Sequence, residues 1–186
     1  MKKIAIATIL ATSALAASAA DFVSVSVDQV TNRSTDAVST VQYVRAGKEI
    51  SGVQYGLQSR TAAARDGSSL KNSLEGYVGK NLGVAGLNVQ PFVGIGYDNG
   101  KNGATDAQYT YGLVGVSVGA PIGGGYALAG VKTRVASSED NLTNQTVSFA
   151  QYAYPVAKQV NLIAGASYSA QDIKERAYSL GVQVGF

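Results

Sequence analysis

The 186-residue chain contains no cysteine and no histidine, and these two absences exclude much catalytic and metal-binding chemistry. The protein cannot form a disulfide, use a cysteine nucleophile, build a Ser-His triad or assemble an ordinary zinc site. Asp and Glu side chains remain as acids and bases, but the adjacent loop carboxylates Glu139 and Asp140 would point to opposite faces of an extended chain. We therefore expect no enzyme activity, no cofactor and no bound metal ion.

The chain also lacks tryptophan, has only three prolines, and carries little charge of either sign. Its net charge is +3, and loss of Lys2 and Lys3 with the N-terminal segment would leave about +1 (3 minus 2). A nucleic-acid partner usually requires a concentrated basic patch, so we expect none. The 22 glycines and 11 tyrosines are instead typical of a β-rich protein.

After residue 20 there is no apolar run long enough to form a transmembrane helix. The one long apolar run, residues 4–17, follows the basic start of the chain and precedes small residues at 18–20. It is shorter than the ~20 residues that a spanning helix needs. This order of charged, apolar and small-residue regions predicts a cleaved export signal over 1–20, with cleavage after Ala19 or Ala20. The mature domain would then be residues 21–186.

Apolar and polar residues alternate with period two along most of this mature domain, which predicts β-strands throughout. Long polar connections take turns with short ones, as an antiparallel meander requires. The ten predicted strands are 22–31, 37–46, 50–61, 70–80, 86–97, 107–119, 124–136, 144–154, 159–169 and 176–186. An eight-stranded arrangement is the alternative, in which residues 21–46 form a separate hairpin or plug. The fold class is therefore all-β.

Alternation alone does not separate a soluble β-sandwich from a membrane barrel, but three features favour the barrel. Glycine is frequent on the polar face, which suits a narrow lumen better than a hydrated surface. Tyrosines stand mostly near predicted strand ends, where aromatic girdles meet lipid headgroups. The last strand ends on an aromatic residue. These tyrosines are Tyr43, Tyr97, Tyr109, Tyr126, Tyr154, Tyr168 and Tyr178. We expect a transmembrane antiparallel up-and-down β-barrel.

The end of the chain resembles the C-terminal signature of bacterial outer-membrane β-barrels. Alternate positions carry Tyr178, Leu180, Val182, Val184 and the final Phe186. The resemblance implies an outer-membrane location, surrounding outer-membrane lipid, and recognition of these residues by the barrel-assembly machinery. It also implies that the last strand pairs with the first, which removes both edges of the sheet.

A second similarity extends over about residues 152–186. The segment from Tyr154 through Lys158 to Leu162 is similar to the short turn before the penultimate strand of general proteobacterial porins. The chain lacks the Pro-Glu-Phe-Gly-Gly-like segment that marks the constriction loop of many porins. The resemblance therefore implies a porin-like barrel and leaves the porin pore mechanism open.

Charged residues on the predicted lumen face are the candidates for a functional site. They are Asp28, Arg60, Lys71, Glu75, Lys132 and Arg134. They can neutralise one another in a filled interior, or they can form a charged constriction that selects small solutes. The excess of four basic over two acidic groups would then mildly favour anions.

Two functions remain open at this point. The first is a narrow passive pore for small hydrophilic solutes or ions. The second is a non-conducting structural or surface-interaction barrel that contacts partners through its loops. The sequence does not indicate the oligomeric state.

Overall fold

The computed structural model describes residues 20–64, 69–102, 105–136, 145–171 and 174–186. The predicted signal segment lies outside these ranges except for Ala20, as do Glu139 and Asp140. Within the described ranges, no helix is long and apolar enough to cross a membrane.

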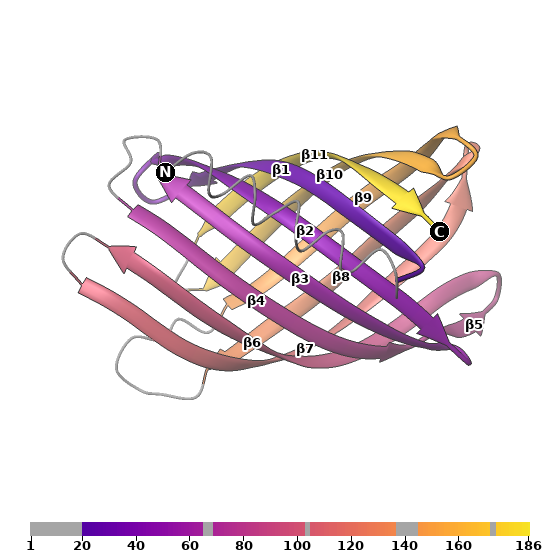
Figure 1. The fold of residues 1–186 in the computed structure, drawn as a ribbon, viewed down its shortest axis with the longest axis horizontal. Coiled ribbons are helices and arrows are strands. Elements are labelled where there is room, and N and C mark those ends of the chain that lie inside the picture. The colour runs from indigo at the N-terminus through magenta and orange to yellow at the C-terminus, as the bar shows by residue number, and fades with distance from the viewer. Residues whose placement is uncertain (1–19, 65–68, 103–104, 137–144, 172–173) are drawn as a thin grey trace.

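The chain folds into one closed antiparallel barrel of tilted strands (Figure 1). The strands are β1 (Phe22–Asn32), β2 (Val38–Ile50), β3 (Val53–Ala64), β4 (Ser69–Lys80), β5 (Leu82–Val84), β6 (Leu87–Asn102), β7 (Thr105–Ile122), β8 (Gly125–Ala136), β9 (Gln145–Ala157), β10 (Val160–Gln171) and β11 (Glu175–Gly185). The short β5 continues the line of β4 after Asn81, and both pair with β6. The barrel wall therefore has ten strands, and it closes where β1 pairs with β11.

The structure confirms the prediction of a ten-stranded antiparallel barrel. The eight-stranded alternative is wrong, because β1 and β2 pair with each other and with the neighbouring strands β11 and β3. Several strands run further than predicted. β2 continues to Ile50, and the β6–β7 hairpin reaches Asn102 and Thr105. Backbone hydrogen bonds continue there although the apolar alternation stops, so hydropathy did not reveal these ends.

Three connections between strands are turns of two residues with positive φ at both positions. They are Ser51-Gly52 (φ 53° and 76°), Ala85-Gly86 (50° and 81°) and Gly123-Gly124 (57° and 81°). This backbone is that of a type I′ turn, whose twist matches the twist of the flanking strands. Glycine at the second position of each turn adopts the conformation without a Cβ clash. The first of these turns lies beyond the gap between the predicted strands 37–46 and 50–61, because β2 is longer than expected.

The pairing register places large apolar side chains on the outside and most charged ones inside. Ile95 is 75% exposed and Leu180 is 72% exposed on the outer wall, whereas Glu75 is 3% exposed and Asp28 is 6% exposed within the lumen. Outward residues Val114, Val116 and Val118 alternate with inward Gly115, Ser117 and Gly119, as predicted. The closed wall therefore has an apolar exterior and a polar interior.

The tyrosines divide between the two faces. Tyr97, Tyr154, Tyr168 and Tyr178 are exposed on the outer wall, as expected for a girdle. The girdle prediction is wrong for Tyr43, Tyr109 and Tyr126, whose register or contacts place them in the lumen. A tyrosine near a strand end can lie in the outer girdle or in the lumen. Only the face of the strand on which it stands decides between these two locations.

Inward tyrosine rings lie over glycines of the neighbouring strand. A Cβ added at Gly96 would lie 2.2 Å from Cζ of Tyr111, and one at Gly56 would lie 2.0 Å from Cζ of Tyr77. Both pairs are direct cross-strand neighbours. Gly56 and Gly96 therefore do more than reduce bulk, because each leaves the space that an aromatic ring occupies.

This packing predicts that Gly96→Val destabilises the barrel. The added side chain must displace the Tyr111 ring, and overpacking of this kind typically costs about 1–3 kcal/mol. Urea-induced unfolding of the refolded barrel measures the difference. Gly76→Ala on the outer face is the matched control, since no heavy atom lies within 4 Å of its added Cβ. Equal stability of the Gly96→Val variant and the wild type would contradict the proposed ring-on-glycine packing.

Candidate functional site in the barrel lumen

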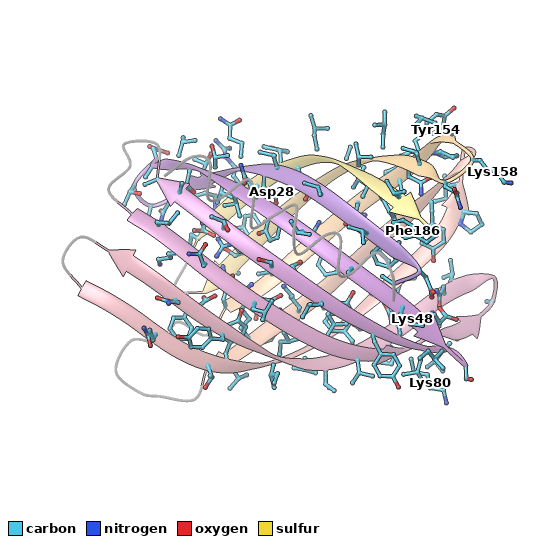
Figure 2. All side chains as sticks on the ribbon, in the orientation of Figure 1. Asp28, Lys48, Lys80, Tyr154, Lys158 and Phe186 are labelled. Carbon is cyan, nitrogen blue, oxygen red and sulfur yellow. The ribbon has the colours of Figure 1, made fainter. Side chains whose placement is uncertain are left out.

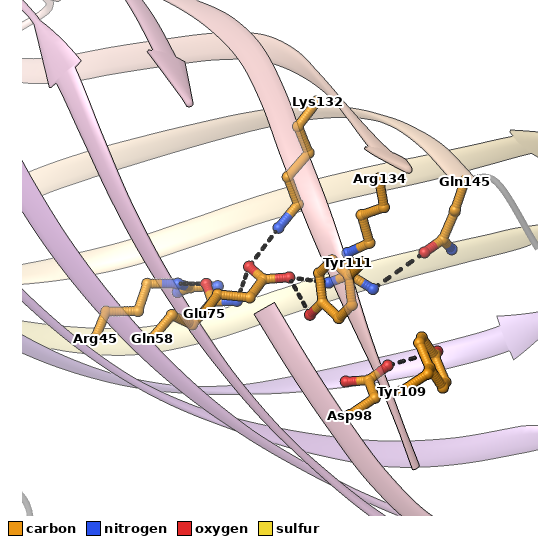
Figure 3. Close-up of polar contacts among 9 residues, drawn as sticks. All are labelled: Arg45, Gln58, Glu75, Asp98, Tyr109, Tyr111, Lys132, Arg134 and Gln145. Atoms are coloured by element: carbon orange, nitrogen blue, oxygen red, sulfur yellow. Dashed lines mark hydrogen bonds and ion pairs between the residues drawn. The ribbon is translucent and has the colours of Figure 1, made fainter. Parts of the chain in front are cut away.

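Glu75 is the centre of a polar cluster that crosses the lumen (Figure 3). It projects inward from β4, while Lys132 and Arg134 project from β8 on the far side. Lys132 Nζ lies 2.9 Å from Oε2 of Glu75, and Arg134 forms an ion pair with Oε1. Two cations from one strand therefore share a single buried carboxylate of another.

Neutral donors complete the surroundings of this carboxylate. The Tyr111 hydroxyl donates to Oε1 at 2.9 Å, and Gln58 Nε2 donates to Oε2 at 3.0 Å. Tyr111 reaches Glu75 because the residue between them in the register, Gly96, has no side chain. Four donors around two oxygens hold the charged form in place, as a buried carboxylate requires.

The cluster continues to both sides of the barrel. Arg45 donates from Nε to Oε1 of Gln58 at 2.8 Å and from Nη1 to Oγ of Ser26 at 3.1 Å. On the other side, Arg134 Nη1 donates to Oε1 of Gln145 at 3.2 Å. The result is an unbroken polar layer from β1 to β9. We call it the Glu75 layer, and its members are Ser26, Arg45, Gln58, Glu75, Tyr111, Lys132, Arg134 and Gln145.

Two internal cavities border the Glu75 layer. A cavity of about 220 Å³ is lined by residues that include Tyr77, Gln90 and Phe92, which lie toward the short turns. A second of about 60 Å³ is lined by residues that include Arg60 and Glu175, toward the long connections. Lys132 borders both cavities. The layer therefore narrows the lumen between two hollow spaces.

The structure brings together three of the six charged residues selected from the sequence, namely Glu75, Lys132 and Arg134. Asp28 borders the larger cavity and Arg60 the smaller one. Buried Oδ1 of Asp28 and buried Nε of Arg60 have no hydrogen-bond partner. Lys71 is exposed near the end of the lumen, opposite Gly100, and it does not join the layer.

Other members of the layer were not identified from the sequence. Arg45 lies in the predicted strand 37–46, where neither face is cleanly apolar, so its inward direction was not apparent. Tyr111 and Gly115 lie on the same side of β7, the side that faces the lumen. Their even spacing was the only sign in the sequence that Tyr111 points inward. With Arg45 and Glu175 included, four cations and three carboxylates line the two cavities among the described residues. The excess of positive charge is thus smaller than predicted.

The final strand lies where the C-terminal motif implied. Tyr178, Leu180, Val182, Val184 and Phe186 are exposed on the outer wall. The backbone N–H of Phe186 donates to the carbonyl of Asp21 at 3.0 Å, and the β11–β1 register runs from Gly185↔Phe22 to Glu175↔Asn32. The expected closure of the last strand on the first is confirmed. Recognition of these residues by an assembly machinery stays a prediction.

No protein-family model matches the chain, and no curated protein matches it. Solved structures with a similar fold include Neisserial surface protein A, at 13% identity and a TM-score of 0.49 over 89% of this chain and 96% of that one. The β domain of the Bordetella autotransporter Brka matches at 14% identity and a TM-score of 0.49, over 89% and 98%. KdgM porin matches at 11% identity and a TM-score of 0.46, over 88% and 99%. These likenesses concern the general fold alone.

Proposed function

We propose that this chain is an integral outer-membrane β-barrel whose lumen gives narrow passage to small hydrophilic solutes or ions. The membrane location rests on the outer wall, where large apolar side chains are exposed on strand after strand. Patches of this extent are rare on soluble monomers, since exposed apolar surface in water is unfavourable. An apolar outer wall is stable when lipid surrounds it, and closure of the barrel leaves no strand edge exposed to the lipid.

The polar lumen supports the passage. Ten strands leave a bore only slightly wider than the eight-stranded barrel that side chains fill. The two cavities are polar at several points, and the Glu75 layer lies between them. The proposed path runs through these cavities, and the Glu75 layer is its constriction. Ions or small solutes would pass when its side chains move apart.

The same layer favours a second candidate function. Its ion pairs and hydrogen bonds join seven strands across the lumen, which is what a non-conducting structural barrel would use to stiffen its wall. Such a barrel would act through its exposed connections and contact partners outside the membrane. The two candidates differ in whether the layer ever opens.

Planar-bilayer recording on the purified, refolded mature chain separates the candidates. We expect brief, discrete current steps of small and uniform size, because a rigid polar constriction must rearrange before ions pass. A mock preparation from the same refolding procedure is the control. Folded insertion is checked by the difference in gel mobility with and without boiling. A barrel that is inserted but shows no step above the control would reject the pore and favour the structural barrel.

We also propose that the outward residues of β11 are read by the barrel-assembly machinery during insertion. The support is their exposure at every second position of β11 and at Phe186, which directly follows this strand.

A further inference from the structure

The outer wall carries a group of basic side chains at the end of the barrel that bears the long connections. Arg176 on β11 pairs in register with Thr31 of β1 and with Tyr168 of β10, so all three share the outer face. Arg33 follows β1, and its backbone N–H donates to the carbonyl of Lys174 at 2.7 Å. We call Arg33, Lys174 and Arg176, with Tyr168, the seam patch, since it lies where the first and last strands meet.

The Arg33 guanidinium is held against the outer wall. Its Cζ lies 4.2 Å from the centre of the Tyr168 ring, and both residues are exposed. A cation over an exposed tyrosine face gains a modest attraction, and Tyr168 is the direct cross-strand neighbour of Arg176. Arg33 thus stands beside the cross-strand neighbour of Arg176, and the exposed Lys174 is joined to Arg33 through the backbone.

Directly along the strands from the seam patch, the apolar exterior begins. Tyr178 and Leu180 follow Arg176 outward on β11, and Val27 lies on the neighbouring β1. If hydrocarbon covers these residues, the patch stands at the depth of the lipid headgroups. Long basic side chains at this depth extend toward the interface and attract anionic headgroups.

No ion pair joins Arg33, Lys174 or Arg176 to a carboxylate in the part of the chain that the structure describes. Glu175 lines the smaller lumen cavity instead, and Asp36, in the connection after β1, makes no ion pair with the three cations. At the short-turn end, Nζ of Lys48 lies 4.0 Å from Oδ1 of Asp21. Figure 2 places Lys48, Lys80 and Lys158 at that opposite end. The seam patch thus gathers three basic residues that have no carboxylate partner among the described residues.

We propose that the seam patch binds the phosphate group of an anionic membrane lipid, with the acyl chains lying on the apolar wall beside β1 and β11. This inference rests on the proposed membrane location and adds a lipid site on the outer wall. An Arg side chain can bind two phosphate oxygens through parallel hydrogen bonds, and the other two basic residues of the patch add positive charge beside it. The continuous apolar wall next to the cations selects a lipid over free phosphate.

Native mass spectrometry of the refolded mature barrel in nonionic detergent tests the proposal. Equal concentrations of dioleoyl phosphatidic acid and dioleoyl phosphatidylcholine serve as probes. We expect preferential binding of phosphatidic acid, with a drop of about fivefold for each charge removed among Arg33→Gln, Lys174→Gln and Arg176→Gln. The matched control is Lys48→Gln with Lys80→Gln and Lys158→Gln, which removes the same charge at the other end and should keep the preference.

Three outcomes would overturn the lipid site. They are equal binding of both lipids by the wild type, an undiminished preference in the seam variant, and displacement of phosphatidic acid by excess inorganic phosphate. Gel mobility with and without boiling shows that each variant is folded. A folded, inserted barrel without lipid preference would reject the seam patch and leave the proposed function standing. Failure of the wild type to insert would instead reject the proposed function.

Discussion

Glu75→Ala is expected to lower the free energy of unfolding by about 3–5 kcal/mol, the usual effect of removing one partner from a buried ion pair. Both cations would lose their carboxylate, and the side chains of Lys132 and Arg134 are only 18% and 14% exposed. Tyr111 and Gln58 would lose an acceptor as well. Urea-induced unfolding in detergent micelles measures the change. Lys71→Gln, an exposed lumen cation outside the layer, should change stability by less than about 0.5 kcal/mol.

A triple variant tests whether the loss comes from unpaired charge. Glu75→Met with Lys132→Met and Arg134→Met removes the carboxylate and both cations together, and such replacements are often neutral or stabilising. We therefore expect the triple variant to be more stable than Glu75→Ala alone. If Glu75→Ala has the stability of the wild type, the layer is not a formed ion-pair network, and the proposed constriction is wrong.

The same variant is expected to change conduction. Glu75 is the link between the Arg45–Gln58 side of the layer and the Arg134–Gln145 side. Without it, the remaining cations repel each other and the two sides separate more readily. Planar-bilayer recordings should show a larger open fraction for Glu75→Ala than for the wild type. An unchanged current in a folded variant would place the constriction elsewhere.

The barrel itself was predictable from the sequence because strand periodicity is local. A residue two positions away lies on the same face, so Val114 and Val116 reveal their orientation without any knowledge of the partner strand. Closure was predictable because the motif from Tyr178 to Phe186 resembles a C-terminal signature that implied pairing of the last strand with the first. The periodicity and the C-terminal motif can each be recognised in a segment of about ten residues.

The Glu75 layer depends on what lies across the lumen, and alternation contains no such information. That Glu75 faces Lys132 follows from the number and stagger of the strands, which only the closed barrel sets. Position near a strand end does not show which face a tyrosine occupies. Tyr109 was therefore expected in the girdle, although its hydroxyl donates to Asp98 in the lumen. Glycine on the paired strand is the signal that sequence reasoning missed, as Gly96 opposite Tyr111 shows.

Ile95→Arg is expected to have the largest effect of any single change on the outer wall. Ile95 is 75% exposed and stands near the middle of β6, where the proposed hydrocarbon core would be deepest. Arginine at the bilayer midplane of a barrel costs about 2–4 kcal/mol. The measurement is the free energy of unfolding from lipid vesicles into urea. In water the same substitution on an exposed residue would change stability by less than about 0.5 kcal/mol.

Ile122→Arg is the depth-matched control for this prediction. Ile122 is 58% exposed on the same wall, but it is the last residue of β7, next to a two-residue turn. Arginine near the interface costs only about 0–1 kcal/mol, because its long side chain reaches the headgroups. A large loss for Ile95→Arg beside a small one for Ile122→Arg therefore reports depth in a bilayer. Equal and small losses at both positions would mean that water covers the apolar wall, and the proposed membrane location would then be rejected.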